Sequence, residues 1–266
     1  MLKEKVATAT RSELVKFERV GEVAVLTMSF APHNLLGEGL SRALMAALSR
    51  ATEEKCRAVV LRSSLRHFST GADLALFEDR GARFQQALKP LDLLREFEEH
   101  PLPIVASVHG VALGGGFELA LACDIIVAAS SSKFGLVEVT LGLHPLMGGI
   151  QRVMQRVGAA RAKEMVMLGR RHDAATLERW GIVNRVVPDA QLNELSMAVA
   201  QELALGPTIA HGCTKRLVNM YLNEGMAKAD TAMAEITKPI WKSDDLQSGL
   251  KSYSEKGLGQ AIFTGK

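Results

Sequence analysis

The residues best suited to chemistry gather at 109–124, where three consecutive glycines precede a glutamate. The glycines, residues 114–116, follow an apolar run at 103–108 that is typical of a strand, and they precede a run typical of a buried helix. Glycine lets a ligand approach the main chain closely, and the first turn of a helix offers free N–H groups. The stretch therefore predicts a site for an oxyanion or another anion. Glu118, in the first turn of that helix, is either a plain partner of the helix dipole or a catalytic carboxylate.

A second glycine loop, residues 67–74, repeats the order of a strand, a tight turn and a predicted helix. Its strand lies at 57–62, and its helix is predicted at about 81–99, before Pro101. Because the unit occurs twice before residue 120, two loops can place two backbone donors around one acceptor atom. The alternative is that both loops are only tight turns.

The rest of the first half also alternates strands with helices. A valine-rich, alternating pattern follows a mixed opening segment and predicts a strand at 22–29, and residues 31–34 read as a turn. Apolar residues at helical spacing from Leu40 to Leu48 predict a helix, and a buried strand is expected at 125–128.

The second half is mostly helical by the spacing of its apolar residues. Residues 133–139 lead into a loop at 142–149, and one short strand is expected at 182–187. Helices are predicted at 151–157, 159–168, 174–180, 192–205, 208–223 and 226–238. Strands mixed with helices, followed by helices alone, indicate an α/β core built as ββα-type turns of a spiral with a helical C-terminal region.

Composition excludes several classes of protein. With 266 residues, 47% hydrophobic and 23% charged, the chain has ample material for a globular core. A net charge of +3 is too small to argue for nucleic acid or an anionic membrane surface. Cys56, Cys123 and Cys213 fit no metal-ligand spacing and are typical of a reducing compartment. The first twenty residues lack a secretory pattern, and no apolar run is long enough to span a membrane, so a cytoplasmic location is expected.

Several segments, taken in order, resemble the crotonase, or enoyl-CoA hydratase/isomerase, superfamily. The sequence VHGVALGGGFELA at 108–120 is similar to its signature. The other matching segments are FSTGAD at 68–73, FGLVEV at 134–139, PLMGGIQR at 145–152, and the helix and strand at 174–187. The resemblance covers about residues 14–256, and such an ordered set is far more specific than one glycine-rich stretch.

The resemblance implies a crotonase-like ββα spiral core at residues 1–200, which carries an acyl-CoA site, and a C-terminal helical oligomerisation region at 201–266. It implies an acyl-CoA thioester as the substrate, no nucleic-acid or membrane partner, and a homotrimer or homohexamer. No metal or redox cofactor is implied, since CoA is part of the substrate. The backbone N–H groups of Ala72 and Gly115 are implied to form an oxyanion hole for the thioester carbonyl.

Two glutamates, Glu118 and Glu138, match the catalytic pair of the family's hydratases. Adding water across a C=C bond needs one group that takes a proton from water and one that delivers a proton to the α-carbon. By resemblance, Glu118 activates the water and Glu138 protonates the α-carbon, and two carboxyls in one pocket have their pKa values driven apart. The alternative for Glu138 is an exposed loop acid. The other substrate-binding residues implied by the match are His33, Phe68, Thr70, Gly71, Asp73, Leu74, Gly114 and Leu146.

Two residues in the loop at 142–149 depart from the family pattern. Leu146 stands where hydratases have a glycine whose backbone helps to position water, so it bears on water placement or narrows the acyl pocket. His144 stands where an apolar residue is more usual, and it either faces the substrate as an extra acid or base or is hydrogen-bonded within the loop. Arg62 and Arg66 are candidate partners for the CoA phosphates or are solvated surface charges.

Three functions from different classes remain open on the sequence alone. The leading one is an enoyl-CoA hydratase. The second is an isomerase or C–C bond hydrolase of the same fold that uses one glutamate. The third is a non-catalytic acyl-CoA-binding or RNA-associated family member. A dinucleotide site is disfavoured, because no GxGxxG with an acid about twenty residues further on fits the spacing.

Overall fold

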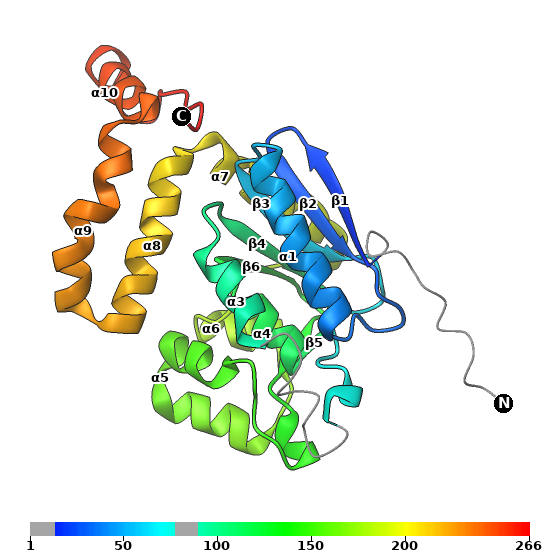
Figure 1. Ribbon diagram of the computed structural model, residues 1–266. Helices are drawn as coiled ribbons and strands as arrows, with labels where there is room; N and C mark the ends of the chain where they lie inside the picture. The colour runs from blue at the N-terminus through cyan, green and yellow to red at the C-terminus, as the bar shows by residue number, and fades with distance from the viewer. Residues whose placement is uncertain (1–13, 78–89) are drawn as a thin grey trace.

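The computed structural model describes residues 14–77 and 90–266, and in this part of the chain two sheets are flanked by helices (Figure 1). The strands of the larger sheet are, in spatial order, β1 (Val15–Val20), β2 (Val23–Met28), β3 (Ala58–Ser63), β4 (Ile104–Val108), β6 (Ile125–Ala129) and β9 (Arg185–Val187). β1 pairs antiparallel with β2, and the other neighbours pair parallel. The smaller sheet consists of β5 (Val111–Leu113), β7 (Lys133–Gly135) and β8 (His172–Asp173).

The helices lie between and after the strands. The α-helices of the described residues are α1 (Glu38–Glu53), α3 (Pro90–Glu99), α4 (Gly115–Leu121), α5 (Gly149–Leu168), α6 (Ala174–Arg179), α7 (Leu192–Leu205), α8 (Thr208–Glu224), α9 (Met226–Trp241) and α10 (Asp244–Lys256). Short 3-10 turns occur at η2 (Leu74–Phe77), η4 (Glu138–Leu141) and η5 (Asp189–Gln191).

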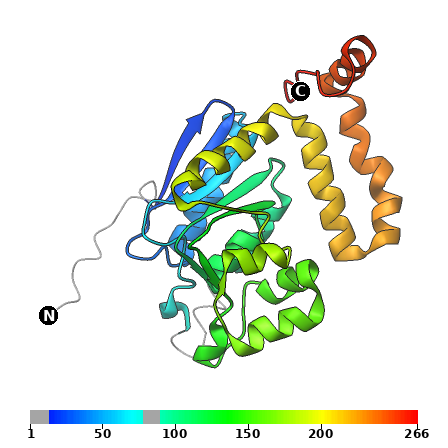
Figure 2. The same ribbon diagram turned by 180° about the vertical axis from the view of Figure 1, so that it is seen from behind.

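The strands β2, β3, β4 and β6 of the larger sheet are buried on both faces, to which successive side chains of a strand point in turn. On β2, Ala24, Leu26 and Met28 belong to the same core cluster as the apolar face of α1. Val23 and Val25 belong to a second cluster with the buried residues of α7. Figure 2 shows α7 lying across the face of the sheet that is opposite to α1. The sheet is therefore a fixed layer from which the loops of the site project.

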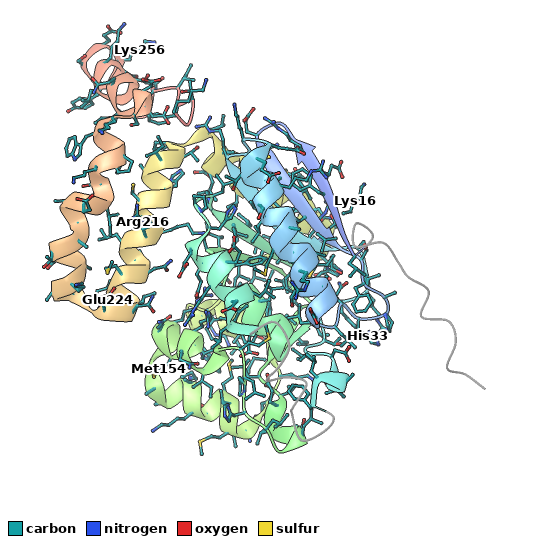
Figure 3. All side chains as sticks on the ribbon, viewed as in Figure 1. Lys16, His33, Met154, Arg216, Glu224 and Lys256 are labelled. Atoms are coloured by element: carbon teal, nitrogen blue, oxygen red, sulfur yellow. The ribbon has the colours of Figure 1, made fainter. Side chains whose placement is uncertain are left out.

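The C-terminal helices α8 and α9 run side by side and project from the body of the molecule (Figures 1 and 2). In Figure 3, Glu224 at the turn between them lies on the opposite side of the molecule from His33. Lys215 ties α8 to the core, because its Nζ donates to Asp124 at 2.7 Å and to two backbone carbonyls. Large apolar side chains nevertheless stay exposed on these two helices, namely Val218, Tyr221, Leu222, Met226, Met233 and Trp241.

Most of the predicted elements are present, and the α/β class is confirmed. The two helices predicted at 151–157 and 159–168 form one element, α5, interrupted at Gly158, whose φ is 76°. The strands β1, β5, β7 and β8 and the helix α10 were not predicted as regular elements. Of the helix predicted at 81–99, residues 81–89 lie outside the described residues. The domain boundary at residue 200 stays a prediction, and α7 runs across it.

Within the described residues, no helix has both the length and the apolar character needed to cross a membrane.

Candidate active site

The two glycine loops meet at the first turn of α4. The loop after β3 joins the chain near β5, because Leu113 N–H donates to the carbonyl of Ser69 at 3.1 Å. Gly116 approaches so closely that a Cβ there would lie 2.6 Å from Ser69. Only glycine fits at that position, and its small size lets α4 begin directly against residues 69–72.

Two backbone donors come together at this junction. A methyl built on Gly115 would lie 3.4 Å from the backbone nitrogen of Ala72. Among the described residues, neither the N–H of Ala72 nor that of Gly115 has a hydrogen-bond partner. Unpaired N–H groups beside each other are what a developing oxyanion requires.

A buried polar network holds the loop that carries Ala72. The side-chain nitrogen of Asn34 donates to Ser63 Oγ at 2.8 Å and to the Phe68 carbonyl at 2.9 Å. Ser69 Oγ donates in turn to the carbonyl of Asn34 at 2.7 Å. All of these groups are buried and paired, so the loop is fixed before any ligand arrives.

Glu118 is almost fully buried, with 1% of its surface exposed, because every residue of α4 is buried. Its Oε1 accepts hydrogen bonds from two backbone N–H groups of the loop before α5, Gly149 at 2.7 Å and Met147 at 3.0 Å. Its Oε2 has no partner among the described residues and remains available for a ligand or a water. A carboxylate held by two backbone donors has a fixed orientation.

Glu138 begins the 3-10 turn η4 and comes close to the first glycine loop. A Cβ on Gly114, whose φ is 47°, would lie only 2.9 Å from Glu138 Oε1. Its Oε2 is buried and has no hydrogen-bond partner. An unpaired buried carboxyl oxygen is costly, and it is more easily kept as the protonated, neutral acid. The alternative of an exposed loop acid is therefore wrong for the described conformation.

Burial raises the pKa values of both carboxyls. For Glu118, burial and, to a smaller extent, the charge of Glu138 raise the pKa from 4.5 to about 7. The hydrogen bonds from Gly149 and Met147 and the charge of Arg152 act to lower the pKa but only partly offset this increase. For Glu138, burial raises the pKa, while its own backbone N–H and His144 oppose the shift. Each carboxyl can therefore exchange a proton nearer to neutral pH than an ordinary side-chain acid.

Replacing Glu138 by Gln is expected to lower the pKa of Glu118 below about 7, because it removes the negative charge that Glu138 carries whenever it is ionised. Burial remains, so the pKa should stay above 4.5. Titration of the ¹³C carboxyl signals of glutamate-labelled protein measures this, with the Glu118 signal assigned by its loss in Glu118→Gln. An unchanged or higher pKa would contradict the coupling of the two groups.

The two carboxyls and the two N–H groups line one pocket of about 530 Å³, open solvent at its mouth included. Nine of the sequence-predicted residues lie around it, namely Thr70, Gly71, Ala72, Leu74, Gly114, Gly115, Glu118, Glu138 and Leu146. The apolar wall also includes residues that were not predicted, Phe77, Val137, Leu141, Leu143 and Met147. Val137 and Met147 lie within the matching segments, and Phe77, Leu141 and Leu143 lie within a few residues of them. The apolar residues in and beside each motif were therefore the signal available.

Three predicted binding residues do not line this pocket. Phe68 is fully buried in the main core. Asp73 accepts from Ala75 N–H at 3.0 Å and so caps the turn η2. His33 is exposed, and its ring stacks on that of His67 with centroids 6.2 Å apart. Their part in binding stays a prediction.

The two departures from the family pattern both lie at the pocket. The His144 Nδ1 is 2.8 Å from the carbonyl of Pro145, so the ring is hydrogen-bonded within its own loop. Leu146 lines the pocket, and its backbone N–H has no partner among the described residues. A leucine at this position thus keeps the donor that a glycine would offer.

The arginines proposed for the CoA phosphates differ in their surroundings. Arg62 is half-buried, and its Nε donates to Thr27 Oγ1 at 3.0 Å, whereas Arg66 is exposed. In the described part of the chain, no three His, Cys, Asp or Glu side chains are placed to hold a metal ion.

The same fold occurs in solved structures of enoyl-CoA hydratases. A structure titled enoyl-CoA hydratase subunit I from Geobacillus kaustophilus HTA426 superposes with a TM-score of 0.88 at 32% identity, covering 95% of this chain and 98% of that one. The chain therefore has the crotonase fold with a helical C-terminal region, as the sequence resemblance implied.

The chain belongs to the enoyl-CoA hydratase/isomerase family, whose model matches residues 18–265. It is 34% identical to a probable enoyl-CoA hydratase of Rhizobium meliloti (strain 1021), covering 92% of this chain and 96% of that protein. It is also 34% identical to an enoyl-CoA isomerase/hydratase of Mycosarcoma maydis, covering 79% of this chain and 77% of that protein. The family acts on acyl-CoA thioesters.

Proposed function

We propose that this protein is an enoyl-CoA hydratase, which adds water across the 2,3 double bond of an unsaturated acyl-CoA. The observation that carries the proposal is one pocket lined by two carboxyls beside two unpaired backbone N–H groups. Glu118 is buried, and Glu138 is half-buried with its Oε2 buried. Hydration needs both kinds of group, because charge develops on the thioester oxygen while two protons move.

In the proposed reaction the thioester carbonyl accepts hydrogen bonds from the N–H groups of Ala72 and Gly115. Glu118 takes a proton from water, and the resulting hydroxyl oxygen bonds to C3. The electron pair of the C2=C3 double bond forms the C1=C2 bond of an enolate, and the electron pair of the carbonyl double bond moves to the thioester oxygen. Glu138 then gives its proton to C2 as the enolate collapses, and exchange with solvent restores the two carboxyls to their starting states.

The pKa values of the carboxyls support these roles. A base with a pKa of about 7 is half ionised near neutral pH and remains strong enough to take a proton in the transition state. Burial raises the pKa of Glu138, and its Oε2 is unpaired. When Glu118 is ionised, Glu138 is therefore favoured in the protonated form that an acid needs, because two neighbouring carboxyls do not both ionise readily. Both groups also serve the reverse reaction with their roles exchanged.

The apolar wall supports an acyl chain as the bound group. Leu74, Phe77, Leu141 and Leu143 offer hydrocarbon surface to the pocket. No metal or redox cofactor enters the proposal, because the reaction changes no overall oxidation state and backbone donors stabilise the enolate. We further propose assembly as a homotrimer or homohexamer through the exposed apolar side chains of α8 and α9.

The decisive experiment follows the absorbance of the conjugated enoyl thioester with crotonyl-CoA, then with longer and aryl enoyl-CoAs. The wild-type protein is expected to remove the band, and Glu138→Gln should slow this by about 10² to 10⁴-fold, the usual range for a lost general acid. Product hydration is checked by mass, as a gain of one water.

An isomerase is the second candidate, supported by Leu146 at the position of the hydratases' glycine and by the isomerase/hydratase relative. Conversion of a 3-enoyl-CoA to its 2-enoyl isomer without a mass change, together with no hydration of any 2-enoyl-CoA, would favour it. Binding of acyl-CoA without either reaction would favour the non-catalytic reading.

A further inference from the structure

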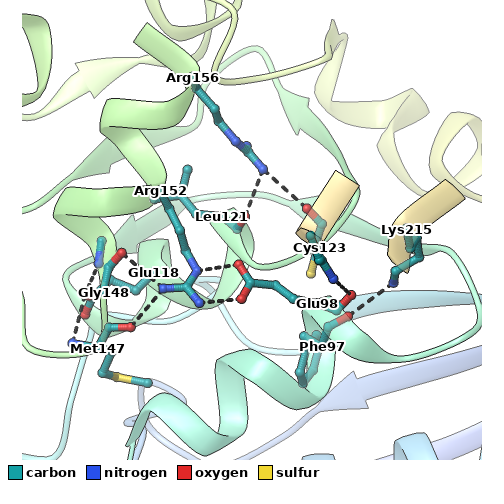
Figure 4. A network of polar contacts seen from close by, with 12 residues as sticks. Phe97, Glu98, Glu118, Leu121, Cys123, Met147, Gly148, Arg152, Arg156 and Lys215 are labelled. Carbon is teal, nitrogen blue, oxygen red and sulfur yellow. Dashed lines mark hydrogen bonds and ion pairs between the residues drawn. The ribbon is translucent and has the colours of Figure 1, made fainter. Parts of the chain in front are cut away.

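A partly buried ion pair lies next to the loop that holds Glu118 (Figure 4). Arg152, in the first turns of α5, donates from Nε and Nη2 to the two carboxylate oxygens of Glu98 on α3, at 2.7 and 2.6 Å. The Arg152 side chain is 10% exposed and that of Glu98 is 29% exposed. A two-pronged pair of this kind fixes the plane of the guanidinium.

The third nitrogen of the guanidinium reaches the loop itself. Arg152 Nη1 donates to the carbonyls of Gly148 at 3.1 Å and Met147 at 3.3 Å. A Cβ on Gly148 would lie 2.2 Å from this nitrogen, and the φ of Gly148 is +94°. The backbone of Gly148 therefore contacts the guanidinium directly, and no other residue fits at this position. Arg152 therefore binds the loop through its carbonyl groups. The N–H groups of Met147 and Gly149 in the same loop bind Glu118.

We propose that Glu98 and Arg152 are positioning residues, which keep the loop at 147–149 in the one arrangement that aims Glu118 into the pocket. Neither side chain lines the pocket, so neither is placed to touch the acyl group. The pair acts on the reaction only through Glu118, and this inference rests on the proposed function for its effect on rate.

The geometry gives the pair a distinct kinetic signature. Displacing a catalytic group by about 1 Å can cost about 100-fold in rate, whereas binding by the unchanged pocket is conserved. Glu98→Gln keeps the size of the side chain and one acceptor oxygen. We expect it to lower kcat about 10- to 100-fold with KM within about twofold of the wild type.

A structural readout tests the positioning without turnover. Hydrogen exchange of the peptide that contains Met147 and Gly149, followed by mass spectrometry on the full protein, should be about 10-fold or more faster in Glu98→Gln, because the loop opens more often. Glu164→Gln is the matched control, since Glu164 lies on the same helix as Arg152 and forms an exposed ion pair with Arg161. It should change neither exchange nor kcat.

Coupling to Glu118 separates positioning from a general loss of structure. In the Glu118→Gln background, the further change Glu98→Gln should leave the residual rate unaltered, because the group it positions can no longer take a proton. The same fractional loss in both backgrounds, or unaltered kcat and exchange in Glu98→Gln, would overturn the proposal.

Failure of the proposed function gives a different pattern. If the wild type hydrates no enoyl-CoA, the rates carry no information, and faster exchange in Glu98→Gln alone still supports the positioning of the loop. If the wild type hydrates and Glu98→Gln shows neither change, the positioning is wrong and the function stands. Arg152→Lys, which keeps the charge but not the two-pronged pairing, should follow Glu98→Gln in both measurements.

Discussion

Replacing Glu118 by Gln is expected to lower kcat for hydration about 10³-fold, within the range that a general base usually contributes. The amide oxygen can still accept the N–H groups of Met147 and Gly149, so the loop and the pocket keep their shape. What the variant loses is the group that takes a proton from water. Steady-state kinetics with crotonyl-CoA measure the change, and fully retained turnover would contradict a mechanism with two carboxylates.

The same variant should be more stable than the wild type at alkaline pH. The folded state raises the Glu118 pKa from 4.5 to about 7, so its favourable contribution is complete below about pH 4.5 and is lost as the pH rises through 7. At pH 8 the ionised carboxyl costs about 3 kcal/mol relative to a neutral group. Urea unfolding at pH 5 and pH 8 tests this, and an equal effect of the substitution at both values would contradict the raised pKa.

The chemistry-bearing residues were readable from the sequence because they lie in local motifs. The glycines at 114–116 directly follow β5, Glu118 lies in the first turn of α4, and Glu138 begins η4. Parallel pairing of β5 with β7 then brings Gly114 and Glu138 together, since Gly114 N–H donates to the carbonyl of Gly135 at 2.9 Å. Local sequence therefore predicted which groups meet at the pocket.

Long-range partners were not readable in this way. Glu98 and Arg152 are 54 residues apart and lie on different helices, and each alone resembles an ordinary solvated charge. Phe68 shows a second limit, because a matching motif gives the position of a residue in the chain and not the direction of its side chain. In the structure, the Phe68 side chain packs in the hydrophobic core.

Two of the missed elements, β1 and α10, have a common cause. The strand β1 is an edge strand with mostly exposed side chains, and its charges at Lys16, Glu18 and Arg19 make it resemble a loop. The helix α10 is likewise polar, although Ser243, whose side chain accepts from Leu246 N–H at 3.1 Å, was a readable capping signal. Solvent-exposed elements have the weakest hydrophobic pattern and so are predicted least well.

Replacing Gly115 by Ala is expected to lower kcat/KM by about 10² to 10³-fold, the usual cost of a lost oxyanion donor. The added methyl would lie 3.4 Å from the nitrogen of Ala72 and 3.1 Å from Met147 Sδ, beside the two unpaired donors. It thus occupies space that the thioester oxygen needs. The φ of Gly115 is not in the left-handed region, so the backbone accepts alanine without conformational strain.

A matched control separates the blocked oxyanion site from a disturbed fold. Gly142→Ala also adds a methyl near the pocket mouth, where no atom lies within 4 Å, although its φ of +73° costs some stability. That variant should keep kcat/KM within a few fold, whereas Gly115→Ala should lose activity while its melting temperature changes little. Full activity in Gly115→Ala would mean that the thioester oxygen does not lie between the N–H groups of Ala72 and Gly115, because the methyl and the oxygen cannot share that space.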